Sequence, residues 1–329
     1  MLTTPLIAAL AARGPVDVVT TPAGAPLLAN HPAVRAVIVY DKRRADAGVG
    51  GLWRLARRLR AARYDAAYMA QGSLRSAALA RFAGARAIVG FETSGGKWLY
   101  TRRVAYAKDR HHAERLLSLA EPAGSSGAGT SPLRNLGIAV QPRLYPGEAE
   151  RTAVDALLRD VPRDGAPYVA LAPGSIWGTK RWPHYAALAK RLAPLFRVIV
   201  VGGPDDAALA AEIASAAGAE RIVDATGKLT LLASAHLLAR CAALVTNDSA
   251  PQHLASAVGT PTLTIFGPTV PAFGFGPLAL RHRTEGLEGL PCRPCDAHGP
   301  HECPLGHWRC MRGLDVAHIE DAVHALLHS

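Results

Sequence analysis

Hydrophobic positions along the chain fall into short runs rich in β-branched residues, which alternate with longer stretches of Ala, Leu and Arg. The short runs predict strands, and the longer amphipathic stretches predict helices. Strands are predicted at residues 16–20, 36–40, 66–69, 87–90, 168–172, 198–202, 221–224, 243–246 and 262–266. Helices are predicted between them, including residues 51–62, 73–82, 182–192, 205–216 and 229–241. This alternation is typical of a parallel sheet with helices on both faces, so the predicted fold class is α/β.

The alternation stops at residues 121–150, and in the first part of this segment, EPAGSSGAGTSPLRN at residues 121–135, Gly, Ser and Pro predict a linker. The second half then repeats the strand and helix pattern, and 329 residues exceed what one hydrophobic core usually serves. We therefore predict an N-terminal domain at residues 1–140 and a C-terminal domain at residues 141–329, which carries a Cys-rich tail at 292–310. Two such halves predict a cleft, with ligands at the carboxyl ends of the strands.

Charge and composition narrow the function classes only slightly. The formal net charge is +11, carried mostly by Arg in an Ala-rich chain. Such a charge attracts phosphates on nucleotides, nucleic acids or anionic lipids, but it can equally reflect genome base composition. No apolar run approaches the roughly 20 residues of a membrane-spanning helix, and the N-terminus lacks the basic start of a signal peptide. We expect a cytoplasmic protein.

The first motif is LAPGSIWGTKRWP, which runs from the end of the strand predicted at 168–172 into the next helix. A loop of this kind presents backbone N–H groups. Ser175 and Thr179 add hydroxyls, and Lys180 adds a positive charge, a set that suits a diphosphate. The alternative is a plain surface loop ahead of an amphipathic helix.

The second motif is VTNDSAPQHLASAVGTPTLTIFGPT, in which a strand is followed directly by a helix from about residue 250. The amides of Ser249 and Ala250, with the helix dipole behind them, form an anion site, and His253 lies near the same mouth. Asp248 is an acceptor suited to sugar hydroxyls. The alternative is that these residues only cap the helix. A weaker third motif, VVGGPDD, places Asp205 where it could accept hydrogen bonds from a ribose or merely cap a helix.

Four of the five cysteines crowd into PCRPCDAHGPHECPLGHWRCM, at Cys292, Cys295, Cys303 and Cys310. Four thiolates can close a tetrahedral structural zinc site, but the spacing matches no standard finger with two C-x2-C pairs. A loop of reduced thiols is an equal alternative.

In the first half, the helix predicted from residue 51 carries Arg54, Arg57, Arg58 and Arg60 on its surface. A Gln-Gly-Ser turn then follows the strand predicted at 66–69. The residues predicted to face an anionic acceptor are Arg57, Gln71, Ser73 and Arg75. A solvated basic face is the alternative.

Taken together, these segments resemble the ADP-heptose:lipopolysaccharide heptosyltransferases, glycosyltransferase family 9. PGSIWGTKRWP is similar to that family's P-G-x-x-x-x-x-K-R-W-P segment, and NDSAPQHLASAVGTPTLTIFGPT to its N-D-S-G-x-x-H-x-A segment and the G-P-T that follows. The ending CRPC…CPLGHWRCM resembles the second-heptose branch. YDAAYMAQGSLRSAALARFAGARAIVGFE and HHAERLL in the first half resemble the family as well.

The resemblance implies a GT-B fold and an inverting glycosyl transfer that requires no metal cofactor. It implies that Lys180 neutralises the departing ADP and that Asp248 holds sugar hydroxyls. The residues it implies for donor binding are Ser175, Thr179, Asp205 near the ribose, Leu229 near the adenine, Ser249, Ala250 and His253. Ala250 stands where the family usually has Gly, but that position needs a free N–H more than it needs a missing side chain.

A larger departure lies at the start of the sequence. The family opens with a buried strand and G-D-x-x-x-T-x-P, whose Asp is its candidate general base. Here Thr3 and Pro5 match the end of that motif. The first strand and the base are therefore absent from this sequence, either because the start is assigned too late or because the protein lacks a base.

The predicted function is heptose transfer from ADP-heptose to the lipopolysaccharide inner core, with an anionic acceptor at the inner face of the inner membrane. One alternative is a related enzyme that uses another nucleotide sugar and another surface glycan. A more remote one is a basic, zinc-containing nucleic-acid-binding protein.

Overall fold

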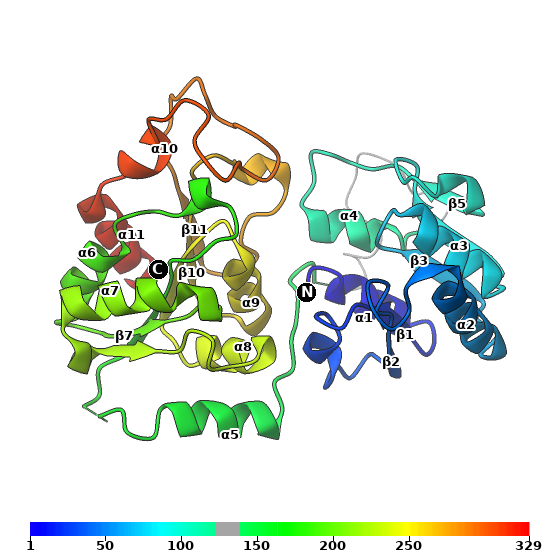
Figure 1. Cartoon of the computed structure of the whole chain (residues 1–329), viewed down its shortest axis with the longest axis horizontal. Helices are drawn as coiled ribbons and strands as arrows, with labels where there is room; N and C mark the ends of the chain where they lie inside the picture. Colours follow the sequence, from blue (N-terminus) through cyan, green and yellow to red (C-terminus); the bar gives the residue numbers. More distant parts are fainter. Residues whose placement is uncertain (123–138, 163, 329) are drawn as a thin grey trace. The chain divides into compact units, whose positions relative to one another are not determined.

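The structure is a computed structural model that describes residues 1–122, 139–162 and 164–328. The chain divides into two compact units, an N-terminal unit of residues 2–142 and a C-terminal unit of residues 143–329 together with Met1 (Figure 1). Most of the segment predicted as a linker, residues 121–135, lies outside the described residues.

The N-terminal unit contains two parallel sheets. One pairs β1 (Asp17–Thr20) with β2 (Ala36–Val39), and the other has the order β3 (Ala66–Met69), β4 (Ala87–Phe91), β5 (Arg102–Val104). Among the residues that the structure describes, no strand pairing joins the two sheets. The helices are α1 (Thr4–Ala11), α2 (Gly48–Ala61), α3 (Leu74–Phe82) and α4 (His112–Ser118).

Helices α2 and α3 pack side by side (Figure 1). Apolar residues at three- and four-residue spacing put Leu55, Ala56 and Leu59 of α2 on one face, where they join Leu79 of α3 and Ile38 of β2 in one buried cluster. The opposite face of α2 is left to solvent.

The C-terminal unit is built on one six-stranded parallel sheet with the order β11-β10-β9-β6-β7-β8. The strands are β6 (Tyr168–Ala172), β7 (Arg197–Val200), β8 (Ile222–Asp224), β9 (Ala243–Asn247), β10 (Thr262–Ile265) and β11 (His282–Glu285). The helices are α5 (Glu148–Leu157), α6 (Tyr185–Leu192), α7 (Ala207–Ala217), α8 (Leu231–Ala239), α9 (Ala250–Val258), α10 (Arg309–Arg312) and α11 (Val316–His328).

The order of these strands places a switch point at the centre of the sheet. From β6 the chain moves outward through β7 and β8, and it then returns to β9 on the other side of β6. In open α/β sheets the loops diverge at such a point and leave a crevice at the carboxyl ends of the two central strands. The ends of β6 and β9 are therefore the expected ligand site of this unit.

The α/β prediction is confirmed, and each predicted strand lies within one or two residues of an observed one. Two strands were missed, β5 and β11. Both are short edge strands of largely polar sequence, RRV and HRTE, and lack the apolar run that marks a buried strand. The helix predicted from residue 182 begins only at Tyr185, because residues 183 and 184 form a turn directly before it, and residues 178–180 form a separate 3-10 turn.

Candidate functional site

The two motifs predicted to bind a diphosphate, LAPGSIWGTKRWP and the one beginning VTNDS, lie next to each other in the C-terminal unit because the strands before them are neighbours. Strands β6 and β9 pair in parallel, with Ala172 opposite Thr246 at their carboxyl ends. The loop that leaves β6 and the residues that leave β9 therefore emerge together at the switch point of the sheet.

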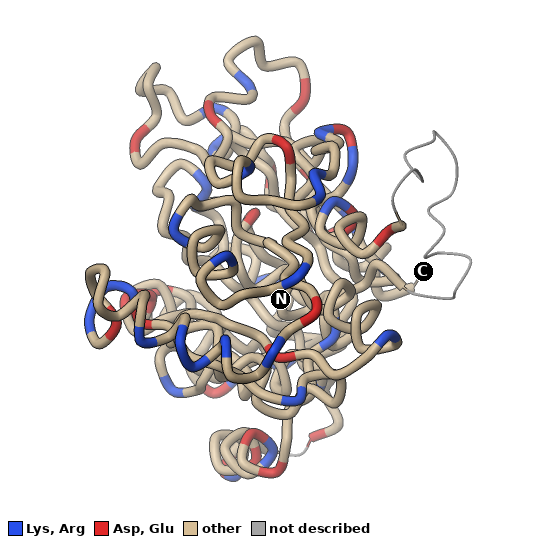
Figure 2. Tube along the Cα trace, turned by 90° about the vertical axis from the view of Figure 1, so that its right-hand side faces the viewer, with Lys and Arg blue, Asp and Glu red and all other residues tan. Residues whose placement is uncertain are grey.

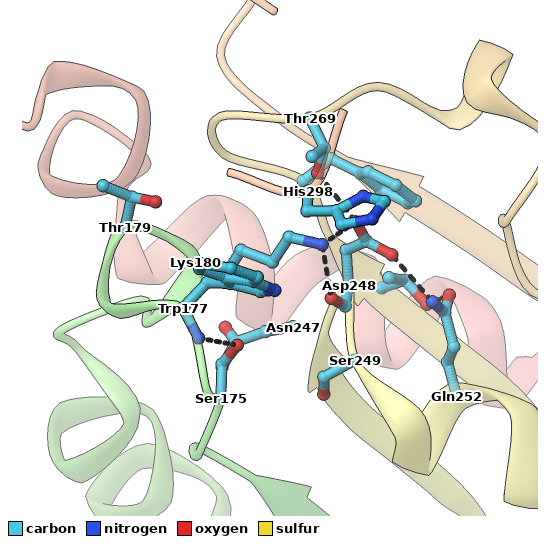
Figure 3. Close-up of polar contacts among 12 residues, drawn as sticks. Ser175, Trp177, Thr179, Lys180, Asn247, Asp248, Ser249, Gln252, Thr269 and His298 are labelled. Carbon is cyan, nitrogen blue, oxygen red and sulfur yellow. Dashed lines mark hydrogen bonds and ion pairs between the residues drawn. The ribbon is translucent and has the colours of Figure 1, made fainter. Parts of the chain in front are cut away.

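An ion pair joins the two motifs. The Lys180 ammonium lies 2.6 Å from Asp248 Oδ2 and also donates to the Asp248 carbonyl oxygen at 3.1 Å (Figure 3). Both side chains are 10% exposed, so solvent screens the pair only weakly. Lys180 has three N–H donors, and this geometry leaves one of them for a ligand.

Asp248 is the centre of a wider network than the sequence suggested. Its Oδ2 also accepts from Thr269 Oγ1 at 2.7 Å, and its Oδ1 accepts from Gln252 Nε2 at 2.9 Å (Figure 3). A carboxylate has about four acceptor positions, and three are filled. The main partner of Asp248 in this structure is thus Lys180, with room for about one further donor.

Asn247 ties the two loops together beneath this pair. Its Oδ1 accepts from the Trp182 amide and the Tyr185 hydroxyl, each at 3.2 Å, and its Nδ2 donates to the Pro173 carbonyl at 2.8 Å. The side chain is completely buried. The sequence motif alone did not predict this role for Asn247. Its position at the end of a buried strand, with a Pro-Gly turn after the neighbouring strand, is the sequence feature that could have indicated this role.

Helix α9 presents its N-terminus at the same place. Ser249 is its N-cap residue, but the hydroxyl of Ser249 does not cap the helix, and the first turn contains no acidic residue. Pro251 has no N–H and the Gln252 amide donates to the Ser249 carbonyl, so the amides of Ser249 and Ala250 are the ones suited to an anion. His253 lies half-buried in the first turn of the helix.

Ser175 and Thr179, predicted together as hydroxyl donors to the ligand, face different ways. Ser175 Oγ accepts from the Trp177 amide at 3.2 Å, which leaves its own proton free to donate. Thr179 is buried, and both its hydroxyl and its amide donate to the Pro300 carbonyl. In Figure 3 Thr179 lies apart from Lys180 and Asp248 and shares no contact with them, so the structure does not bring Thr179 into the cluster.

Asp205 and Leu229 lie on adjacent loops. Asp205 is exposed at the start of α7 and Leu229 is half-buried before α8, while Gly227 packs against Pro204 between them. The neighbouring Asp206 is the residue that contacts the site: its carboxylate accepts from the Gly203 amide at 2.9 Å and packs against Gly174 so closely that a side chain there would collide with it.

The Cys-rich segment packs against the Lys180 loop. Gly299 is buried at φ +80°, and a Cβ there would lie 2.9 Å from Pro268 Cγ and 3.5 Å from Lys180 Cε. Glycine adopts this positive φ without strain and has no Cβ to collide with Pro268. The adjacent His298 extends toward Lys180 and Asp248 (Figure 3), and its ring centroid lies 6.3 Å from that of Trp177. Sequence reasoning placed this segment only in a zinc context.

The cysteines themselves are not arranged as a metal site. Cys310 is buried and Cys295 is exposed, with its thiol directed to the Cys292 carbonyl. Burial acts to raise the pKa of the Cys303 thiol, but the backbone amides of residues 305–308 outweigh it and lower that pKa. Within residues 1–122, 139–162 and 164–328, no three His, Cys, Asp or Glu side chains are grouped so as to hold a metal ion. Structural zinc stays a prediction from spacing alone.

The residues predicted to bind the acceptor lie in the N-terminal unit, and two of them have structural partners. Ser73 caps α3 by accepting from the Ser76 amide at 3.2 Å. Arg75 donates to the Tyr40 hydroxyl at 2.6 Å and to the carbonyls of Asp46 and Gly48 at 3.0 and 2.9 Å. Arg75 therefore anchors the β2–α2 loop and is not a free cation.

Gln71 is exposed in the β3–α3 loop, close in sequence to Ser73 and Arg75. Arg57 is exposed on α2, and its guanidinium makes no hydrogen bond or ion pair with any residue that the structure describes. The four predicted acceptor residues are therefore two structural side chains and two exposed ones.

Parallel strands, two α/β units and an ammonium beside a helix N-terminus suit an enzyme that binds a phosphate-containing ligand, and a glycosyltransferase that uses an activated sugar is one such enzyme. Comparison with known families agrees. Residues 52–306 match the model of glycosyltransferase family 9 (heptosyltransferase). The chain belongs to this family and is a glycosyltransferase.

Named relatives are similar over most of the chain. Lipopolysaccharide heptosyltransferase 2 of Escherichia coli K12 is 30% identical over 291 residues, which cover 83% of this chain and 80% of the relative. Lipopolysaccharide heptosyltransferase 1 of Pseudomonas aeruginosa is 31% identical over 285 residues, 80% of this chain and 73% of the relative.

Solved structures agree with the fold. The structure of E. coli ADP-heptose lipopolysaccharide heptosyltransferase II superposes with a TM-score of 0.79 at 27% identity, covering 99% of this chain and 94% of that one. E. coli heptosyltransferase WaaC with ADP superposes with a TM-score of 0.70 at 22% identity, covering 99% and 95%, which supports the fold alone.

These findings confirm the family and the GT-B fold. They overturn the remote alternative of a nucleic-acid-binding protein with a zinc module. In the described part of the chain, no helix combines the length and the apolar character that a membrane span requires.

Proposed function

We propose that this protein transfers heptose from ADP-heptose to the inner core of lipopolysaccharide. The observation that carries the proposal is the Lys180–Asp248 pair at the N-terminus of α9. Relatives named as lipopolysaccharide heptosyltransferases are about 30% identical over most of the chain, which supports heptose transfer to the same class of acceptor, and the similar solved structure named for ADP-heptose supports the donor.

In this proposal the diphosphate of the donor binds between the Lys180 ammonium and the amides of Ser249 and Ala250 at the N-terminus of α9. The oxygen of an acceptor hydroxyl forms a bond to the anomeric carbon and releases its proton to solvent. As the bond from that carbon to the diphosphate breaks, negative charge grows on the departing ADP. The remaining N–H of Lys180 and the amides of Ser249 and Ala250 would donate to this charge, and such preorganised donors are the main source of catalysis in comparable sites. His253 and the Ser175 hydroxyl add donors at the same mouth.

Asp248 acts mainly by positioning Lys180. Held by Thr269 and Gln252, its carboxylate fixes the ammonium in one place, and its remaining acceptor position is suited to one sugar hydroxyl. Asp205 and Leu229, on adjacent loops, would contact the ribose and the adenine. No metal cofactor has a role in this scheme.

The acceptor is a phosphate-bearing glycolipid core, which the N-terminal unit would bind through Gln71 and the β3–α3 loop at the inner face of the inner membrane. The positive charge of the chain is the physical support for an anionic acceptor.

The test is turnover with ADP-heptose and a heptose-deficient lipopolysaccharide core, measured as released ADP. Lys180→Ala should reduce kcat on the order of 100-fold or more, the usual effect of removing one such donor. Lys190→Ala, which removes an exposed lysine of α6, is the matched control and should retain wild-type turnover. Near-normal turnover of Lys180→Ala would reject the role of this residue. Faster transfer from a GDP- or UDP-sugar would reject the donor.

A further inference from the structure

The net positive charge of the chain comes from one unit. Residues 2–142 contain 20 Lys and Arg against 8 Asp and Glu, a net charge of +12. The remaining residues contain 17 and 18, a net charge of −1. Base composition would act on both halves alike. The asymmetry therefore points to a function of the N-terminal unit, and Figure 2 marks these charges along the chain.

Exposed aromatic side chains show the same asymmetry. Within the described residues, the exposed Trp and Phe side chains are Trp53, Phe82 and Trp98, and all three lie in the N-terminal unit. Trp98 lies under the cations of Lys97 and Arg103, at 5.4 and 5.6 Å from its ring centroid. Trp53 and Phe82 form an edge-to-face pair with centroids 5.7 Å apart.

The Trp53–Phe82 pair lies on the solvent side of α2 and α3. Residues 49, 53, 57 and 60 follow one another at four- and three-residue spacing, so Val49, Trp53, Arg57 and Arg60 share one face of α2. Val49 is 80% exposed and Trp53 is 52% exposed. The opposite face of the helix holds the buried core residues, so apart from the Trp53–Phe82 contact between α2 and α3 this apolar strip is open to solvent.

Unpaired guanidinium groups surround the strip. Arg57, Arg60 and Arg81 are exposed, and none of their guanidiniums forms a hydrogen bond, ion pair or ring contact with a residue that the structure describes. Arg60 extends across the end of α3, where its Cγ would lie 3.7 Å from a Cβ at Gly84. Other arginines of this unit, such as Arg75 and Arg102, each donate to two backbone carbonyls.

We propose that the α2–α3 surface, made of Val49, Trp53, Phe82, Arg57, Arg60 and Arg81, docks the protein on an anionic lipid bilayer. Trp and Phe favour the boundary between lipid headgroups and acyl chains, and arginines beside them bind headgroup phosphates. A membrane partner rests on the proposed function, since a lipid-anchored acceptor must be met at a bilayer. The docking surface and the residues that form it are not part of that proposed function.

The test is co-sedimentation with vesicles of phosphatidylethanolamine and phosphatidylglycerol, compared with vesicles of phosphatidylcholine alone. The wild-type protein should bind the anionic vesicles and lose this binding in 0.5 M salt. Arg60→Gln with Arg81→Gln should weaken binding on the order of 30-fold, since each basic side chain near an anionic surface contributes about fivefold. Trp53→Ala with Phe82→Ala should weaken binding about tenfold or more, and the residual binding should be more sensitive to salt.

The matched control is Leu280→Ala with Arg281→Gln, which removes an exposed apolar and an exposed basic side chain from the C-terminal unit. It should bind vesicles like the wild-type protein. Equal binding by all variants, equal binding to both vesicle types, no vesicle binding, or salt-sensitive binding to nucleic acid with none to vesicles would each overturn the proposal. ADP titration of the same samples separates the two proposals, because donor binding would persist if only the surface assignment were wrong.

Discussion

The strand ends of the two units differ in how their polar side chains are used. In the C-terminal unit, Lys180 and Asp248 hold each other with side chains only 10% exposed, and the buried Asn247 joins the two loops beneath them before any ligand arrives. In the N-terminal unit, Arg75 and Ser73 stabilise the local fold, whereas Gln71 and Arg57 extend into solvent. A fixed network suits a site that must stabilise charge at one point, because preorganised dipoles need no rearrangement during reaction.

The exposed basic surface of the N-terminal unit suits a different task. Its guanidiniums are solvated and can adapt to phosphates at variable positions, and the attraction acts over about a Debye length. The C-terminal unit is therefore suited to stabilising charge at one fixed point. The N-terminal unit is suited to binding an anionic partner whose phosphates lie at variable positions.

The largest expected effect tests the rigidity of the C-terminal network. Asn247→Ala leaves the Trp182 amide, the Tyr185 hydroxyl and the Pro173 carbonyl without their partner, and each such buried loss costs about 1–3 kcal/mol. The free energy of unfolding should fall by about 4 kcal/mol in urea denaturation. Gln71→Ala, the exposed amide of the other unit, should change it by less than about 0.5 kcal/mol. Equal effects would remove the contrast between the units.

Acid should weaken the N-terminal unit through His112. Burial, with help from the Arg115 and His111 charges, lowers the pKa of His112 from 6.5 to about 4. The unfolded chain takes up a proton below pH 6.5 while the folded one does not, so stability is complete above pH 6.5 and falls between pH 6.5 and 4. The loss should reach at most about 3 kcal/mol. His112→Gln should flatten the stability profile over this range, and an unchanged slope would contradict the assignment.

A smaller loss is expected where an arginine of the N-terminal unit serves the fold. Arg75→Met removes three hydrogen bonds to the β2–α2 loop. Because the group is only partly buried, the cost should be about 2 kcal/mol. Arg57→Met, which breaks no contact with a described residue, is the control and should be neutral. Hydrogen exchange at residues 46–48 would report the released loop, and unchanged protection there would refute the anchoring role.

The smallest effect concerns the contact between the Cys-rich segment and the donor loop. Thr179→Val keeps the shape of the side chain and removes the hydroxyl that donates to Pro300. The unfolding free energy should fall by about 1 kcal/mol. Ser175→Ala, whose hydroxyl only accepts from the Trp177 amide, should cost less. Faster hydrogen exchange at residues 299–301 in Thr179→Val alone would support the contact.

Much of the fold was predictable, because strands of a buried parallel sheet consist of nearly continuous apolar residues. VALA before Pro173 and LVTN before Asp248 marked both central strands, and the PGS and NDS motifs after them located the site. The edge strands RRV and HRTE were not predictable, since solvent-exposed polar strands carry no such run.

The pairing of side chains across the site could not be predicted from sequence. Asp248 was expected to bind sugar hydroxyls, but its partner in the structure is Lys180, 68 positions earlier in the chain. Thr179 was grouped with Ser175 by proximity in sequence, but the 3-10 turn at residues 178–180 rotates it toward Pro300. The contact of Gly299 with the Lys180 stem is likewise set by tertiary packing, which the cysteine spacing did not indicate.

The central claim is that the carboxyl ends of β6 and β9 bind a nucleoside diphosphate through the Lys180 ammonium and the N-terminus of α9. Calorimetric titration with ADP tests it most directly, with the wild-type protein and Lys180→Ala side by side. We expect wild-type binding well below millimolar concentration and a loss of about tenfold or more in the variant. No ADP binding at millimolar concentration, or equal affinity in both proteins, would contradict the claim.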